Sequence, residues 1–152
     1  MSSTRRSAVW LALLVLAPRA RAGYVNFEAS HVHPVAVAGS RLVAVNTPDA
    51  RLEVFAIDGS GGLGRLASIP VGIEPVSVVV RTASEVWVAN HLSDTVTIVD
   101  LDLGTAVRTL EVGDEPTDIA FAAGRALLAT TGPPAGVGRF ALTGSRIGGT
   151  QP

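Results

Sequence analysis

Short apolar runs separated by turn-forming residues follow one another along most of the chain. In one stretch, four such runs alternate with three turn sequences, the runs at residues 76–80, 85–89, 95–99 and 107–112 and the turns at 83–84, 91–94 and 100–104. Short runs rich in valine, isoleucine and threonine are typical of β-strands. The run at 76–80 is apolar on both faces, as a strand is when its sheet is covered on both sides. The pattern predicts four short strands in about 40 residues.

The same pattern recurs with a constant period. Pro34, Pro75 and Pro116 are spaced 41 residues apart, and the sequences at 71–75 and 112–116 match almost residue for residue. Four strands in each repeat of about 40 residues are the signature of a β-propeller blade. We therefore predict an all-β protein built of β-propeller repeats, each of four antiparallel strands. The repeats lie at about 30–73, 74–114 and 115–152.

The middle repeat carries sequences that match a known repeat type. They are Val-Trp-Val-Ala-Asn at 86–90, Ser-Asp-Thr-Val-Thr-Ile-Val-Asp at 93–100 and Val-Gly-Asp-Glu-Pro at 112–116. With these residues the chain resembles the YVTN-type β-propeller repeat proteins of bacterial surfaces and periplasms, over about residues 30–143. The resemblance implies a propeller of about seven blades and leaves function open, because such propellers are scaffolds with diverse roles. Residues 131–136 depart from the repeat, which indicates an incomplete third repeat.

The length of the repeat region limits ring closure. A closed propeller needs at least four blades, or roughly 160 residues at this period, and the segment 23–152 is shorter than that. We expect an incomplete ring of about three blades. Such an arc is part of a larger propeller, a truncated gene product, or a subunit that completes a ring by oligomerising. Its two open blade faces predict marginal stability or self-association.

The first 22 residues have the organisation of a signal peptide. Arg5 and Arg6 precede the apolar run at 8–17, and an Ala-Arg-Ala sequence ends at Ala22. A membrane-spanning helix needs about 20 apolar residues, so we predict cleavage after Ala22 and no membrane span in the mature chain. The protein is then exported to the periplasm, the cell surface or the medium. The arginine pair also resembles a twin-arginine signal, although Sec export fits the following residues better.

Composition excludes several kinds of chemistry. All 12 basic residues are arginines, and cysteine is absent, which removes a Schiff-base lysine, a Walker phosphate loop, a thiol nucleophile and cysteine metal sites. Without residues 1–22, acidic residues outnumber basic ones by 13 to 8. An acidic domain is a poor partner for nucleic acid. We expect neither a nucleic-acid partner nor a cofactor.

Polar residues gather on one predicted face of the arc. If the four strands a to d run from the centre outward, the b–c turns and the d–a links between blades share a face. The links contribute His31, His33, Glu74, Asp114 and Glu115, and the turns contribute Asn46, Asp49, Asn90, His91 and Asp94. Eight of them are the candidate ligand-binding residues, and all three histidines of the chain are among these eight: His31, His33, Asn46, Glu74, Asn90, His91, Asp94 and Glu115.

Each of these residues also has a simpler interpretation. His31 and His33 are two positions apart, so an extended segment would direct both rings to one side, as a metal site or an acid–base pair requires; a solvated loop is the alternative. Glu74 and Glu115 recur at equivalent positions, which favours a structural role at the strand starts. Asn46 and Asn90 precede turns and are expected to form Asx turns. The sequence therefore assigns no metal ligand.

Two classes of function follow. No G-x-S-x-G nucleophile motif is present, and Trp87 and Phe121 are most simply core residues between blades. This favours an exported binding or interaction scaffold that contacts a protein or a surface ligand, with no catalytic residue. The alternative is a lactonase-like or metal-dependent propeller enzyme whose site lies on the same polar face.

Overall fold

The computed structural model describes residues 29–131 and 136–141, so the predicted signal peptide lies outside the described residues. In this part of the chain no helix is long and apolar enough to cross a membrane. The described strands are β1 (Val35–Ala38), β2 (Arg41–Asn46), β3 (Arg51–Ile57), β4 (Leu63–Pro70), β5 (Pro75–Val80), β6 (Glu85–Asn90), β7 (Thr95–Asp100), β8 (Thr105–Glu111), β9 (Pro116–Ala122), β10 (Arg125–Thr130) and β11 (Gly136–Ala141).

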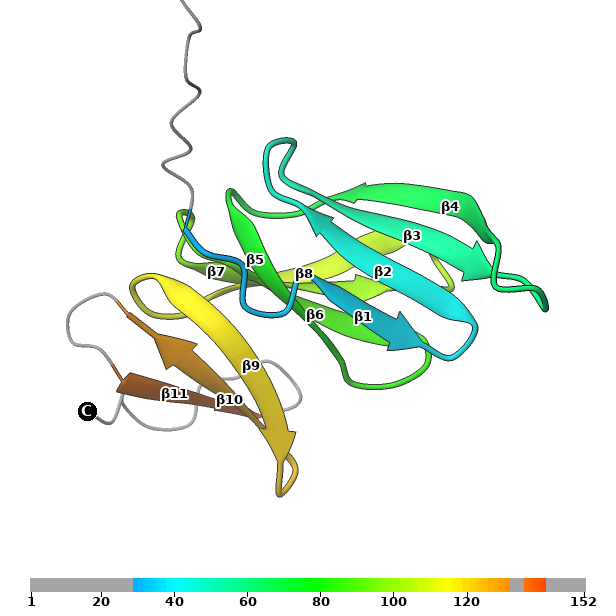
Figure 1. The fold of residues 1–152 in the computed structure, drawn as a ribbon. Helices are drawn as coiled ribbons and strands as arrows, with labels where there is room; N and C mark the ends of the chain where they lie inside the picture. Colours follow the sequence, from blue (N-terminus) through cyan, green and yellow to red (C-terminus); the bar gives the residue numbers. More distant parts are fainter. Residues whose placement is uncertain (1–28, 132–135, 142–152) are drawn as a thin grey trace, which may run out of the picture.

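These strands form three antiparallel sheets in which sequence neighbours pair. Blade 1 has the order β1-β2-β3-β4, blade 2 the order β5-β6-β7-β8, and blade 3 the order β9-β10-β11. Figure 1 shows the three sheets side by side in an open arc, with β1, β5 and β9 as the inner strands. The predicted all-β fold of propeller blades is confirmed, and the strands of blade 2 lie within two residues of their predicted bounds.

The core consists of the two seams between blades. At the first seam, Val43, Leu52 and Val54 of blade 1 pack with Val78 and Val88 of blade 2. The second seam joins blades 2 and 3. There Trp87 is fully buried, and its ring meets that of Phe121 edge to face at a centroid distance of 5.3 Å. Because blade 2 is covered on both sides, its inner strands are apolar on both faces, as predicted.

The d–a links and the b–c turns lie on one face of the arc, as the strand order requires. Links and turns are joined by backbone hydrogen bonds, from Val71 N to Ala50 O at 3.0 Å and from Val112 N to Asp94 O at 3.1 Å. We call this side the link face. Ala50 and Asp94 close the b–c turns in the left-handed region, with φ of 52° and 55°. That conformation lets each strand pair reverse within a short turn.

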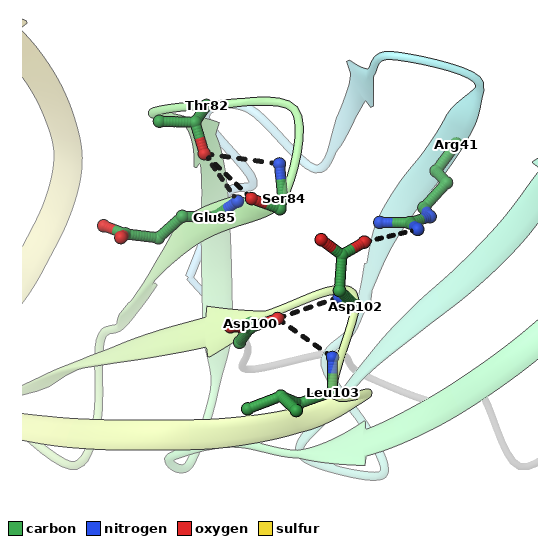
Figure 2. A network of polar contacts seen from close by, with 7 residues as sticks. All are labelled: Arg41, Thr82, Ser84, Glu85, Asp100, Asp102 and Leu103. Atoms are coloured by element: carbon green, nitrogen blue, oxygen red, sulfur yellow. Dashed lines mark hydrogen bonds and ion pairs between the residues drawn. The ribbon is translucent and has the colours of Figure 1, made fainter.

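The a–b and c–d turns form the opposite face. Figure 2 shows that Asp100 ends β7 and accepts hydrogen bonds from the backbone N–H groups of Asp102 and Leu103, at 2.8 and 2.9 Å. This Asx turn is the predicted c–d turn of blade 2. Arg41 of blade 1 reaches across the seam and pairs with Asp102 at 2.6 Å. Residues 29–34 do not belong to any blade sheet and run along the inner strand of blade 2.

Candidate functional site

The segment 29–34, which we call the strap, crosses the inner ends of all three blades. It pairs with β5 in parallel, because Val32 N donates to Val76 O at 3.0 Å and Val78 N donates to His33 O at 2.8 Å. Its first described residue, Ala29, donates its N–H to the Glu74 carboxylate at 2.6 Å. The strap therefore places two of the predicted histidines at the centre of the arc.

His33 is fixed by a carboxylate of blade 3. Its Nδ1 lies 2.9 Å from Oδ1 of Asp118, and the same oxygen accepts the hydroxyl of the fully buried Ser77 at 2.9 Å. Burial alone would raise the pKa of Asp118, but hydrogen bonds from His33, from the backbone N–H of Ile119 and from Ser77 hold that pKa below its ordinary value. Asp118 is therefore an acceptor, and the Nδ1 of His33 carries the proton.

His31 engages a different blade. Its Nε2 lies 2.6 Å from the hydroxyl of Thr47, which is buried and donates to the carbonyl of Pro75 at 2.7 Å. The strap thus holds the ring of His31 against blade 1 and the ring of His33 against blade 3. Their spacing predicted that both rings would lie on one side of the segment. In the structure each ring instead bonds to a residue of a different blade, His31 to Thr47 and His33 to Asp118.

A hollow of about 270 Å³ lies beside His33 among the inner strands. Apolar side chains of β1 and β5, together with one of β9, form most of its wall. It is lined by His33, Val35, Ala36, Val37, Val78, Val79, Val80 and Ile119. We call it the inner hollow. Because the His33 side chain is 60% exposed, its second ring nitrogen is available at the rim of the hollow.

The two recurring glutamates have backbone roles. Glu74 and Glu115 adopt φ of 58° and 53°, which turns the chain from each link into the proline that opens the next inner strand. The carbonyl of Glu74 accepts the N–H of His91, and that of Glu115 accepts the N–H of Thr131. The side chain of Glu74 also satisfies a backbone N–H, that of the strap. The structural role predicted for these residues matches these contacts.

Asn90 is a core residue. Its side chain is fully buried and donates to the hydroxyls of Thr95 and Thr97 at 3.1 and 3.0 Å. Gly72 of the preceding link packs directly on the amide, since a Cβ at that position would lie 2.6 Å from the amide carbon. Asn46 instead donates to Asp49 across the b–c turn of blade 1 at 2.9 Å. Neither contact is the Asx turn expected from the sequence, because both amides bond to side chains.

The remaining predicted residues, Asp94, His91 and Asp114, lie on the link face and make none of the strap contacts described above. Asp94 accepts the N–H of Glu115 at 2.9 Å and so supports the link. His91 is half-buried, and its Nδ1 is buried without a hydrogen-bond partner. Asp114 is exposed. Within the described residues no group of three or more metal-ligating side chains comes together.

Three residues at the centre were missed by sequence reasoning, namely Thr47, Ser77 and Asp118. Ser77 and Asp118 occupy the same position of consecutive repeats, 41 residues apart. Inner strands of neighbouring blades lie side by side, so two polar residues at one repeat position are expected to meet. That spacing was the available signal. Thr47 gave none, because a threonine after Asn46 is ordinary turn composition.

Comparison with known proteins supports the fold. No protein-family model and no curated protein matches the chain. Among solved structures, it is similar to hydrazine synthase of Kuenenia stuttgartiensis, with a TM-score of 0.66 and 18% identity over 82% of this chain and 38% of that one. It is also similar to apo AztD of Citrobacter koseri, with a TM-score of 0.60 and 16% identity over 75% of this chain and 32% of that one. A third similar structure is a candidate 6-phosphogluconolactonase of Bacteroides uniformis, with a TM-score of 0.64 and 14% identity over 80% of this chain and 44% of that one.

These similar structures are β-propeller proteins, and the present chain spans less than half the length of each. At these identities the similarity concerns the fold alone. The described residues are therefore blades of a β-propeller in an open arc, with a strap across their inner ends. What the arc binds has to be argued from its own side chains.

Proposed function

We propose that this chain is an exported β-propeller binding module of the YVTN-repeat type that acts as an interaction scaffold, and that its ligand binds at the inner hollow beside His33. The observation that carries the proposal is the 2.9 Å contact between His33 and Asp118. It holds an exposed imidazole in one orientation at the rim of an apolar hollow. A few fixed polar groups beside an apolar wall are typical of ligand sites.

The polar groups define the ligand that fits best. Nδ1 of His33 donates to Asp118, so in the neutral form of the ring Nε2 is an acceptor. Glu74, Asp94 and Glu115 add negative charge to the link face, which disfavours an anionic ligand. The valines and Ile119 of the inner hollow favour an apolar body. We therefore expect a ligand with an ammonium or hydroxyl head group attached to an aliphatic or aromatic portion.

The side-chain arrangement favours binding over nucleophilic catalysis. Ser77 is the hydroxyl nearest to the pair, but it is fully buried and its proton points to Asp118. A serine nucleophile needs its proton directed to the histidine instead. The described side chains around His33 thus lack an activated nucleophile.

The enzyme alternative has one observation in its favour. A carboxylate that orients an imidazole is also the arrangement of a general base or of a metal ligand. A lactonase-like activity would use His33 to activate water. Hydrolysis of δ-gluconolactone, or stoichiometric Zn²⁺ retention, that disappears in His33→Ala would support the enzyme and refute the scaffold.

Binding can be tested by NMR titration of the full chain with hexylammonium and hexanoate. We expect hexylammonium to shift the amide signals of Val78 and Val80, and His33→Ala to weaken this binding at least fivefold. The control His91→Ala changes a histidine of the same face outside the hollow and should bind as the parent does. Equal binding by His33→Ala, or a preference for hexanoate, would contradict the proposed site.

Export is tested separately. Mass spectrometry of the protein recovered from periplasm or medium should show a chain that begins at Gly23. A chain that keeps residues 1–22 and stays in the cytoplasm would refute the proposed export. In either case the titration above still tests the binding site, because His33 lies within the arc.

A further inference from the structure

A second hollow lies on the face of the arc opposite the link face. It has a volume of about 330 Å³ and is bordered by the a–b turns of blades 1 and 2 and the c–d turn of blade 2. Arg41, Asp102, Ser40 and Ser84 contribute its polar groups, and Ala38, Gly39 and Ala83 contribute its small apolar surface. We call it the turn hollow. It shares no lining residue with the inner hollow, so it is separate from the site beside His33.

Backbone contacts fix the turns that border the turn hollow. The carbonyl of Ser84 accepts the N–H of Leu101 at 2.8 Å, which ties the a–b turn of blade 2 to the c–d turn of the same blade. The a–b turns of blades 1 and 2 also approach each other closely, since a Cβ at Gly39 would lie 3.6 Å from Cβ of Ala83. The walls are therefore held by the blades themselves, as is usual for a ligand site that is largely pre-formed.

An ion pair between two blades stands at one side of the turn hollow. Nη2 of Arg41 in blade 1 lies 2.6 Å from Oδ1 of Asp102 in blade 2. Figure 2 shows Asp102 between Arg41 and the turn that carries Ser84. The contact uses one nitrogen of a guanidinium that has five N–H groups, and one of the two carboxylate oxygens. The pair therefore keeps both donors and an acceptor for a ligand, while its two charges cancel.

The charges at the turn hollow disfavour an ionic ligand. Because Asp102 neutralises Arg41, the residues that line the hollow have no net charge. Asp100 accepts the N–H of Asp102, and its carboxylate adds a negative charge to the same turn, which opposes an anion. A cation would have to compete with Arg41 for Asp102, and the described carboxylates and histidines form no cluster of three that could hold a metal ion. A neutral ligand fits these charges best.

The hydrogen-bonding groups favour neighbouring hydroxyl groups on the ligand. One ligand hydroxyl can accept from Arg41 while the next donates to Asp102, and the two serine hydroxyls can donate or accept. Ala38 is 1% exposed and, with Gly39 and Ala83, offers an apolar patch without bulky side chains. That patch suits the C–H face of a saturated ring. The volume of about 330 Å³ lies at the lower end of the range for small-molecule sites.

We propose that the turn hollow binds a neutral sugar, and that the ion pair of Arg41 with Asp102 holds two neighbouring hydroxyl groups of its ring. The sugar contacts blades 1 and 2 at once, because Arg41 belongs to one blade and Asp102 to the other. Binding therefore stabilises the first seam. This second site goes beyond the ligand proposed for the inner hollow and lies on the other face of the arc.

NMR titration of the full chain tests the class of ligand. The probes are the methyl glycosides of glucose, galactose and mannose, together with glucuronate and glucosamine, which carry the same kind of ring with a negative or a positive charge. We expect at least one methyl glycoside to shift the amide signals of Gly39, Ser40 and Ala83 and to bind more tightly than either charged sugar. Tighter binding of a charged sugar, or no shift by any methyl glycoside, would overturn the proposal.

Two variants test the residues of the turn hollow. Asp102→Asn leaves Arg41 without its ion pair, so binding of the neutral sugar should weaken about tenfold, and glucuronate should bind more tightly than it binds the parent. Ala83→Leu, in an exposed turn, fills the hollow without changing the ion pair and should prevent binding of every probe. The control Asp49→Asn makes an aspartate-to-asparagine change on the link face and should bind as the parent does. Unchanged binding by both Asp102→Asn and Ala83→Leu places the sugar elsewhere and refutes the proposal.

The measurements keep the two proposed sites apart. Circular dichroism checks that the blades form in each variant, and Ala83→Leu still decides the place of binding if Asp102→Asn fails to fold. His33→Ala should leave sugar binding unchanged while it weakens the binding of hexylammonium. Thermal melts give an independent readout, since a methyl glycoside bound across the first seam should raise the Tm of the parent and not that of Ala83→Leu. An equal rise in both would be the general effect of an excluded sugar and would contradict the site.

Discussion

Replacement of Gly72 by alanine tests how the link face is held to the core. An ideal Cβ at this position would lie 2.4 Å from Oγ of Ser93 and 2.6 Å from Cγ and Nδ2 of Asn90. Ser93 can rotate, but Asn90 is fully buried and donates to two threonine hydroxyls. The methyl group therefore has to push the link away from the blade or displace the amide from its partners.

The magnitude follows from these two effects. Overpacking a tight site costs about 1–3 kcal/mol, and one lost hydrogen bond of the amide costs about 1 kcal/mol. We expect Gly72→Ala to lower the free energy of unfolding by about 3 kcal/mol. Gly113, at the same place in the next link, is 3.3 Å from the Thr130 methyl group, so Gly113→Ala should cost about 1 kcal/mol. Gly64→Ala, with nothing within 4 Å, should change stability by less than about 0.5 kcal/mol.

Urea unfolding followed by the fluorescence of Trp87 measures this series. Trp87 is fully buried at the second seam, so its emission shifts when the blades separate. The urea concentration at the midpoint should be highest for Gly64→Ala, lower for Gly113→Ala and lowest for Gly72→Ala. If Gly72→Ala unfolds at the same urea concentration as Gly64→Ala, the link does not approach Asn90 as closely as described, and the reasoning is refuted.

Three further predictions concern other parts of the arc. Ala50 has φ of 52°, so Ala50→Gly should raise the free energy of unfolding by up to about 1 kcal/mol and Ala50→Val should lower it, in thermal melts. The lowered pKa of Asp118 adds stability that is complete above the unfolded-state pKa and is lost as the pH falls through the lower folded-state pKa. The parent should therefore lose more stability than Asp118→Asn as the pH falls below about 4 in acid titrations; parallel profiles would contradict this. Trp87→Ala should cost about 3–5 kcal/mol, and a smaller loss in urea unfolding followed by circular dichroism would show that the second seam contributes less than its burial indicates.

The strands and seams were predictable because their signals are local and repeated. A period of 41 residues with proline at each inner strand gives the blade order, and the alternation within each run gives the faces. Trp87 and Phe121 were recognised as core residues, since large aromatic side chains within apolar strands pack between sheets. The turn at 100–104 was predicted from its composition, while its Asx hydrogen bonds are seen in the structure. None of these inferences required a contact between distant segments.

The strap could not be predicted, because its contacts are long-range and lie outside the repeat. Nothing in residues 29–34 indicates a parallel pairing with β5 or a reach from His33 to blade 3. Asn90 was misjudged for a related reason. An asparagine before a turn usually bonds to the local backbone, but here the following strand supplies two threonine hydroxyls that hold the amide inside the blade.

The positions that depart from the repeat converge on one place. Ala36, Ser77 and Asp118 occupy the same position in the inner strands of the three blades, yet they run from apolar to neutral polar to charged. The proline two residues earlier is kept in all three blades, whereas the valines on either side in blades 1 and 2 become Thr117 and Ile119 in blade 3. Because this position faces the neighbouring inner strand, each change alters the centre of the arc and leaves the seams intact. The strap brings His33 to the most polar member of the series. A scaffold can thus acquire a specific site through one inner-strand position for each blade, and the aspartate of blade 3 is where binding chemistry is to be sought first.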